Sequence, residues 1–130
     1  MGAIIGDICG SIYEFDNHKT DHPETIKLIN PECFYTDDTV LTAAVTEAAY
    51  GDGNYEKAIL KWARAYPKEN YGNSFRAWFL SEYPQPYNSY GNGSAMRVSP
   101  IGWAFSTLEE TLLEAEKSAV CTHNHIEGIK

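Results

Sequence analysis

The chain is short of basic residues. Its 130 residues include 10 lysines and arginines against 18 aspartates and glutamates, which gives a net charge of −8 and an isoelectric point near 4.9. Proteins that bind nucleic acid generally do so through Lys and Arg contacts to phosphates. We therefore expect no general nucleic-acid binding. A phosphate group would be bound here only by a local cluster of N–H groups or by a metal ion.

Cysteines and long apolar runs are also scarce. Cys9, Cys33 and Cys121 are odd in number and form no CxxC pair, so a disulfide framework or a zinc site is not expected and a reducing cytoplasm fits best. No apolar run approaches the roughly 20 residues that cross a bilayer. Asp7 interrupts the apolar N-terminus, and we expect neither a membrane span nor a signal peptide.

Strand-like alternation is absent, and every clear periodic segment is helical. We expect one all-α domain over residues 1–130, since 43% hydrophobic residues suffice for a core in a chain of this length. Helix-start signals include the capping box Ser106-Thr107-Leu108-Glu109 and a cap at Asn73 or Ser74. The segments predicted to be helical are 2–15, 37–50, 55–66, 75–83 and the stretch that follows residue 107.

Two adjacent carboxylates begin one of these helices. Phe34-Tyr35-Thr36-Asp37-Asp38-Thr39 precedes an Ala-rich helix that ends at Gly51. Thr36 suits the N-cap, and the helix dipole stabilises acids in the first turn, which is the ordinary explanation. The alternative is a hard-cation site. Neighbouring carboxylates on a helix diverge by about 100°. Asp37 and Asp38 could therefore bind two ions, or one could bind an ion while the other contacts a ligand of that ion, and Mg²⁺, Mn²⁺ and Ca²⁺ suit such oxygen ligands.

The N-terminal helix carries two acids, Asp7 and Glu14, two turns apart on one face. Glu14 ends this helix among apolar neighbours, a setting that can make a carboxyl group a useful acid or base. A solvated acid at a helix end is the ordinary alternative. Residues 16–32 are polar and irregular, and we expect them to form a mobile loop over Thr36, Asp37 and Asp38.

A glycine-rich loop, Gly91-Asn92-Gly93-Ser94, runs into another helical stretch. N–H groups at such a helix start can cradle an anion, and Arg97 can add a fork for phosphate or for a buried carboxylate. The alternative is an ordinary turn, and the Gly-Lys-Ser/Thr of a P-loop is missing. His123 and His125 cannot share one helix face, but they could flank a ligand by hydrogen bonding or by binding a metal.

Four stretches in this order resemble the ADP-ribosylglycohydrolase family. They are Gly2-Ala3-Ile4-Ile5-Gly6-Asp7 with Glu14, Phe34 to Thr39, Gly91-Asn92-Gly93-Ser94-Ala95-Met96-Arg97, and Thr122-His123-Asn124-His125 with Gly128. Together they extend over essentially the whole chain. The resemblance implies the N-terminal half of a compact orthogonal helical bundle. It also implies a centre of two Mg²⁺ or Mn²⁺ ions and hydrolysis of the bond between ADP-ribose and a protein side chain or a small molecule.

The resemblance further implies roles for individual residues. Thr36, Asp37 and Asp38 would bind the metal ions, and Glu14, Asp37 and Asp38 would carry the catalysis, with Glu14 as acid/base or as the residue that positions water. The glycine loop would wrap the phosphates and ribose, and His123 would lie near the diphosphate. The implied substrate-binding residues are Tyr90, Gly91, Asn92, Gly93, Ser94, Met96, Arg97, His123 and His125.

The family also has a second acidic metal motif in its C-terminal half, and this sequence contains no second Asp-x-Asp cluster. Three expectations stay open. The chain is a piece of a longer hydrolase, is completed by another polypeptide or another copy of itself, or binds ADP-ribose or a related nucleotide without turnover. A helical scaffold that binds neither ligand nor metal is a further alternative. Half of a domain would expose apolar surface, so we expect association in solution.

Overall fold

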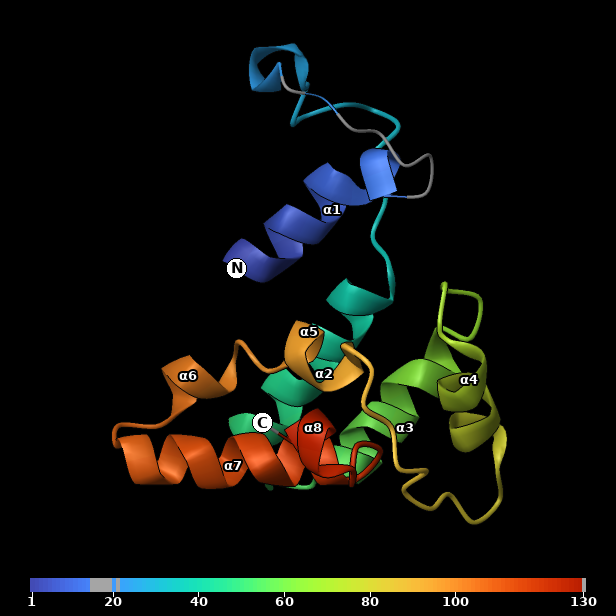
Figure 1. The fold of residues 1–130 in the computed structure, drawn as a ribbon, viewed down its shortest axis with the longest axis vertical. Coiled ribbons are helices and arrows are strands. Elements are labelled where there is room, and N and C mark those ends of the chain that lie inside the picture. Colours follow the sequence, from blue (N-terminus) through green and yellow to red (C-terminus); the bar gives the residue numbers. More distant parts are fainter. Residues whose placement is uncertain (15–19, 21, 130) are drawn as a thin grey trace.

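The computed structural model describes residues 1–14, 20 and 22–129. Every regular element in these residues is a helix, which confirms the all-α prediction (Figure 1). None of the described helices is both long and apolar enough to cross a membrane. The helices are α1 (Gly2–Glu14), the 3-10 helix η1 (Pro23–Thr25), α2 (Asp37–Ala49), α3 (Tyr55–Ala65), α4 (Asn73–Leu80), α5 (Gly93–Arg97), α6 (Ile101–Ala104), α7 (Leu108–Val120) and α8 (Ile126–Ile129).

Helix α2 is the centre of the packing, and it contacts α1, α3, α5 and α6. Its alanines are small enough to let the neighbouring helices approach closely. The α2 residues that contribute to the hydrophobic core are Leu41, Ala44, Val45 and Ala48. They pack with apolar residues of α3 and with the aromatic residues Phe75, Trp78 and Phe79 of α4. This core fixes the start of α2, where Asp37 and Asp38 lie.

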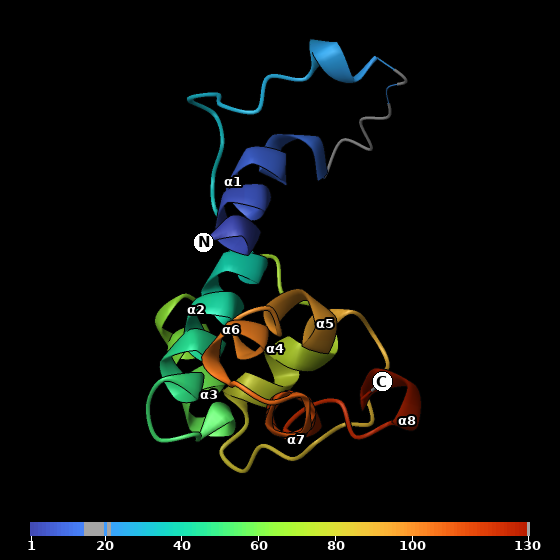
Figure 2. The ribbon, with the colours of Figure 1, turned by 90° about the vertical axis from the view of Figure 1, so that its left-hand side faces the viewer.

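Helix α1 extends outward from the start of α2, which it contacts, and lies between the packed helices α2–α8 and the segment that contains η1 (Figure 2). Ser11 is its one buried residue within the described chain. The described residues of the predicted loop lie beside α1, where the Tyr13 hydroxyl bonds both the carbonyl oxygen and the N–H of Lys27. None of them lines the pocket that Asp37 borders. Residues 16–19 and 21 of that prediction, and residue 15 of the predicted helix 2–15, lie outside the described residues.

Several helix ends differ from the prediction by a few residues. The capping box of α7 is formed by Thr107 and Glu110, because Thr107 Oγ1 accepts the Glu110 N–H at 3.2 Å and donates to its carboxylate. Helix α4 has Gly72 at its N-cap with no side-chain bond, so the predicted caps at Asn73 and Ser74 are wrong. It also ends at Leu80, where Arg64 donates to the carbonyl oxygens of Phe79 and Ser81 and satisfies the helix end.

Candidate functional site

Asp7 joins α1 to the start of α2. Its Oδ1 accepts a hydrogen bond from Thr36 Oγ1 at 2.6 Å, and its Oδ2 accepts from the Thr36 N–H at 2.9 Å. Oδ2 also accepts from the N–H and the hydroxyl group of Thr39, at 3.2 and 2.5 Å. The Thr39 N–H is one of the groups that a helix leaves unpaired in its first turn. Asp7 therefore caps α2 from a distant part of the chain.

Asp7, Glu14, Asp37 and Asp38 form an acidic cluster. Burial raises the pKa of Asp37 to about 6, and the charges of Asp38, Glu14 and Asp7 add to this shift, against a hydrogen bond from its own backbone. The pKa of Asp38 is raised by burial and then by Asp7. The pKa of Glu14 is raised by burial and then by Asp38 and Asp7. The four acids therefore repel one another, and a cation placed among them would relieve the repulsion.

The donor atoms of the acidic cluster suit a hard divalent cation, since Mg²⁺ and Mn²⁺ prefer carboxylate oxygens. Thr36 Oγ1 already donates to Asp7 and accepts from the Asp38 N–H, so one lone pair remains for an ion. Within residues 1–14, 20 and 22–129, no group of three or more His, Cys, Asp or Glu is arranged to hold a metal ion. The residues present fit part of a metal site.

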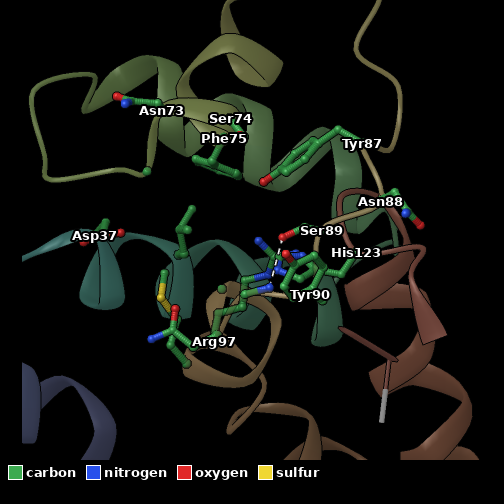
Figure 3. A pocket seen from close by; sticks show the side chains of 16 residues that line it. Asp37, Asn73, Ser74, Phe75, Tyr87, Asn88, Ser89, Tyr90, Arg97 and His123 are labelled. Atoms are coloured by element: carbon green, nitrogen blue, oxygen red, sulfur yellow. Dashed lines mark hydrogen bonds between the residues drawn. The ribbon is translucent and has the colours of Figure 1, made fainter. Parts of the chain in front are cut away.

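A pocket of about 460 Å³ reaches Asp37 (Figure 3). Asp37 lies on one side of it, Tyr87, Tyr90 and His123 lie on the opposite side, and Arg97 lies between them at the base of the view. The start of α4 closes the third side. The other residues that line the pocket are Leu41, Gly72, Asn73, Ser74, Phe75, Asn88, Ser89, Gly91, Asn92, Gly93 and Met96.

Residues 87–91, on the pocket wall, are held by the segment that precedes α8. The Asn88 N–H donates to Asn124 Oδ1 at 2.6 Å, and the Ser89 N–H donates to the Thr122 carbonyl oxygen at 3.4 Å. Asn88 has a φ of 56°, in the left-handed region that asparagine tolerates better than most residues. The wall therefore depends on contacts between residues more than 30 positions apart, as the Asn88–Asn124 separation of 36 shows.

Two basic side chains are buried behind this wall, with exposed fractions of 0% for Arg97 and 2% for His123. Arg97 Nη2 donates to the Ser118 carbonyl oxygen at 3.0 Å and to Thr122 Oγ1 at 2.9 Å. Its Nε and Nη1 have no hydrogen-bond partner in the described chain. Burial lowers the pKa of His123 to about 4 and the Arg97 charge adds to this, while the Gly91 backbone opposes it. The pocket thus lies between the acidic cluster and a buried positive charge.

Comparison with known proteins gives the family. The family model described as ADP-ribosylglycohydrolase matches residues 1–130. The chain is a member of the ADP-ribosylglycohydrolase family. The mouse (Mus musculus) protein ADP-ribosylhydrolase ARH3 is 26% identical, over 94% of this chain and 42% of the mouse protein. The Xenopus tropicalis and Homo sapiens proteins of that name are 28% and 24% identical, over 95% and 94% of this chain. The chain spans less than half the length of these relatives.

Most of the substrate-binding residues implied by the ADP-ribosylglycohydrolase family line the pocket, namely Tyr90, Gly91, Asn92, Gly93, Met96, Arg97 and His123. Two others lie beside it. Ser94 Oγ donates to the Gly128 carbonyl oxygen at 2.8 Å, and the His125 ring lies 5.3 Å from the Tyr90 ring. Ser94 therefore contacts α8, His125 contacts the wall residue Tyr90, and neither Ser94 nor His125 lines the pocket.

Of the implied metal-binding and catalytic residues, Asp37 lines the pocket, and Thr36, Asp38 and Glu14 do not. The charges of Asp38 and Glu14 raise the pKa of Asp37, and Thr36 accepts a hydrogen bond from the Asp38 N–H. The motifs of the ADP-ribosylglycohydrolase family did not point to the start of α4 or to residues 87–89. For the start of α4, the sequence offered one sign of a binding role, the polar residues Asn73 and Ser74 before Phe75. The same two residues are equally typical of a helix cap.

Proposed function

We propose that this chain is the ADP-ribose-binding part of a metal-dependent hydrolase. The reaction is cleavage, by water, of the glycosidic bond between ADP-ribose and a modified protein side chain or a small-molecule acceptor. The observation that carries the proposal is the position of Asp37, which belongs to the acidic cluster and also lines the pocket. A pocket between carboxylates and a buried positive charge suits a ligand with a ribose at one end and a diphosphate at the other.

Asp37 and Asp38, with Thr36 Oγ1 and Glu14, are the residues that would hold Mg²⁺ or Mn²⁺, with two ions in a complete site. When bound, such an ion polarises ribose hydroxyl groups and lowers the pKa of a bound water molecule. The raised pKa of Asp37 supports this assignment, because a carboxylate repelled by its neighbours gains from a nearby cation. The remaining ligands would come from the other half of the family fold or from another copy of the chain.

Glu14 is the residue that we assign as general acid/base. Its side chain is largely exposed at the end of α1, where water can reach it, and partial burial together with the charges of Asp38 and Asp7 raises its pKa. The bond between the C1″ atom of the ribose and the acceptor would break as water adds to C1″ and gives a proton to Glu14, and Glu14 would pass this proton to the departing acceptor. Asp37 and Asp38 would stabilise the oxocarbenium-like transition state.

The other side of the pocket would bind the nucleotide. The backbone of Gly91, Asn92 and Gly93 can approach phosphate oxygens closely, because two of the three residues have no side chain. The Tyr90 ring is 74% exposed and therefore available to stack on a ligand ring. Arg97 would contribute its positive charge from beneath the wall. Its buried Nε and Nη1 have no hydrogen-bond partner in the described chain, so an anion in the pocket would stabilise this charge.

A second candidate is a module that binds ADP-ribose or a related nucleotide without hydrolysing it. Asp7 is fully used by Thr36 and Thr39, and the described residues offer no complete metal-ligand group. The pocket is formed without a complete set of metal ligands, so a ligand could bind in it without metal. For either candidate we propose ADP-ribosylated proteins or small ADP-ribose derivatives as ligands, and the cytoplasm as the location.

Calorimetric titration of ADP-ribose into the chain, with Mg²⁺ and again with a chelator, tests the proposal. Metal-dependent binding would support the hydrolase. Equal binding in both conditions would favour the non-catalytic module, and no binding in either would overturn both. Asp37→Ala should abolish the Mg²⁺ dependence and leave the helical circular dichroism signal intact, whereas Asp52→Ala, in an exposed pair with Lys57, should change neither.

Glu14→Gln separates binding from chemistry. We expect this variant to bind ADP-ribose as the wild type does and to lose hydrolysis of an ADP-ribosylated substrate. Glu56→Gln, an exposed change on α3, is the matched control. Full activity of Glu14→Gln, measured in an assembly in which the wild type is active, would rule out Glu14 as the acid/base.

A further inference from the structure

Three buried side chains, Arg97, Thr122 and His123, form a continuous hydrogen-bonded chain beneath the pocket wall. Arg97 Nη2 lies 2.9 Å from Thr122 Oγ1, and this oxygen lies 2.7 Å from His123 Nδ1. Their exposed fractions are 0%, 0% and 2%. No water competes for these bonds at such burial, so the direction of each bond follows from the number of donors and acceptors.

The hydroxyl proton of Thr122 has one strong acceptor, because the Cys121 sulfur, which also interacts with this side chain, accepts hydrogen bonds only weakly. Arg97 can only donate, so Thr122 Oγ1 accepts from it. The Ala119 carbonyl oxygen lies 3.4 Å from Oγ1 and already accepts the N–H groups of Thr122 and His123, at 3.0 and 2.8 Å. The hydroxyl group therefore donates to His123 Nδ1. A neutral imidazole that accepts at Nδ1 carries its proton on Nε2.

His123 Nε2 faces the glycine loop. The atom is buried and has no hydrogen bond of good geometry among the described residues. A Cβ atom built on Gly93 would lie 3.1 Å from His123 Cε1 and 3.4 Å from Nε2, so the Gly93 backbone lies close to this edge of the ring. The Gly91 backbone acts on the ring as a hydrogen-bond partner that raises its pKa. A proton on Nε2 is thus directed at the backbone of residues 91–93.

The charge state makes the choice of nitrogen important. Because burial and the Arg97 charge lower the pKa of His123 to about 4, the ring has a single N–H at neutral pH. A proton on Nδ1 would leave Nε2 as a buried acceptor, with no donor facing it in the described chain. It would also leave the Thr122 hydroxyl with two poor acceptors, the distant and already occupied Ala119 oxygen and the weakly accepting Cys121 sulfur.

We propose that Arg97 and Thr122 fix the proton of His123 on Nε2, so that the ring donates to the backbone of residues 91–93 and holds this loop in its ligand-binding shape. Arg97, Thr122 and His123 are then positioning residues for the loop. That residues 91–93 bind a ligand rests on the function proposed above, whereas the position of the proton on His123 does not.

Nitrogen-15 NMR of histidine-labelled protein at neutral pH tests the position of the proton without any ligand. We expect the wild type to show His123 with an unprotonated Nδ1 and a protonated Nε2. Thr122→Ser keeps the hydroxyl group and should keep this spectrum. In Thr122→Val the two nitrogen shifts should move toward each other, as in an imidazole that exchanges between tautomers, and those of His125 should not move. Thr122→Ala replaces Thr122→Val if the latter does not fold.

A proton on Nδ1 in the wild type, or a doubly protonated ring, would overturn the proposal. Unchanged His123 shifts in the variant that lacks the hydroxyl group would overturn the role of Thr122. Where the wild type binds ADP-ribose, Thr122→Val should bind it about tenfold more weakly, the effect of about 1.4 kcal/mol, and Thr122→Ser should bind it normally. Failure of the wild type to bind ADP-ribose would reject the proposed function and leave the NMR result standing.

Discussion

Asp7 and Thr36 are joined by two hydrogen bonds, one from the hydroxyl group and one from the backbone N–H of Thr36, although they lie 29 positions apart. Thr36 is the N-cap of α2, and its Oγ1 accepts the Asp38 N–H at 3.2 Å. These bonds connect α1 to the helix start that carries Asp37. The Asp7 carboxylate thus holds the start of α2, with Asp37 and Asp38, beside α1.

Asp7→Ala should therefore destabilise the protein and release α1. Hydrogen bonds to a charged group contribute about 1.5–3 kcal/mol each. Asp7 accepts four of them, and the loss of repulsion within the acidic cluster and new bonds to water offset much of the cost, so we expect a net loss of at least about 2 kcal/mol. Urea denaturation measures the stability, and hydrogen exchange along α1 measures its release. Ser11→Ala, which removes the bond from the Phe34 N–H and the bond to the Ile8 carbonyl oxygen but no charged group, should cost less. An equal cost for the two variants would contradict the role of Asp7.

The pKa of Asp37 predicts how stability depends on pH. Its folded-state value of about 6 lies above the ordinary 3.8, so the folded state binds this proton more tightly than the unfolded state. The stabilisation from this proton is fully present below the ordinary value and is lost as pH rises through 6. Asp37→Asn imitates the protonated form and should stabilise the protein at pH 7 by roughly 1 kcal/mol, since the half-buried group is partly screened. Thermal melts at several pH values should show this gain vanish near pH 4.

Titration of Asp37 should also control metal binding, and here the deprotonated carboxylate is the favourable form. An ion binds the deprotonated carboxylate, so Mg²⁺ affinity should fall as pH drops below 6. Calorimetry of Mg²⁺ binding at pH 7 and pH 5 measures the change. Equal affinity at the two values would argue that Asp37 is not a ligand.

The sequence predicted the parts of the site that depend on local rules. Thr36 was predicted as an N-cap and is one, and the helix that it starts ends at Ala49, close to the predicted residue. Family motifs brought out Asp37, residues 91–93 and His123, which all line one pocket. These features depend on residue type and short spacing, which a sequence displays directly.

The parts that the sequence could not predict depend on contacts between distant segments. The sequence does not predict the role of Asp7, because its partners Thr36 and Thr39 are 29 and 32 positions away. The pocket wall near Ser74 follows from the packing of α4, and no local pattern links it to Asp37. Local sequence determines where a helix forms, but how that helix is oriented against its neighbours depends on contacts throughout the core.

Gly128 permits the close contact between α8 and the pocket wall. A Cβ atom at this position would lie 2.3 Å from the Ser89 carbonyl oxygen, which no real side chain does. Gly128→Ala should displace Ser89 and destabilise the protein by about 1–3 kcal/mol, the usual cost of overpacking. Chemical denaturation and the amide shifts of residues 87–93 report the two effects. Gly102→Ala in α6, where a Cβ atom meets nothing within 4 Å of the described chain, should be neutral or stabilising.

Exposed apolar side chains on α6 and α7 predict association. Trp103 is 87% exposed, Leu108 75% and Leu112 61%, and α6 and α7 contact each other. Surface of this kind is costly in water and is commonly covered by a partner. Light scattering should therefore report a species larger than 14.6 kDa, and Leu112→Gln should shift it toward the monomer, whereas Glu109→Gln on the same helix should not.

Helix α1 offers a second surface for association, and Ile5→Gln distinguishes it from the surface on α6 and α7. Ile5 is 55% exposed on this helix, which has little burial of its own. If Ile5→Gln alone dissolves the assembly, association occurs through α1, beside the acidic cluster, and a second copy could then supply ligands to the metal site. If Leu112→Gln alone dissolves it, the acidic cluster stays open to a different polypeptide. A wild type that scatters as a monomer would contradict both surfaces.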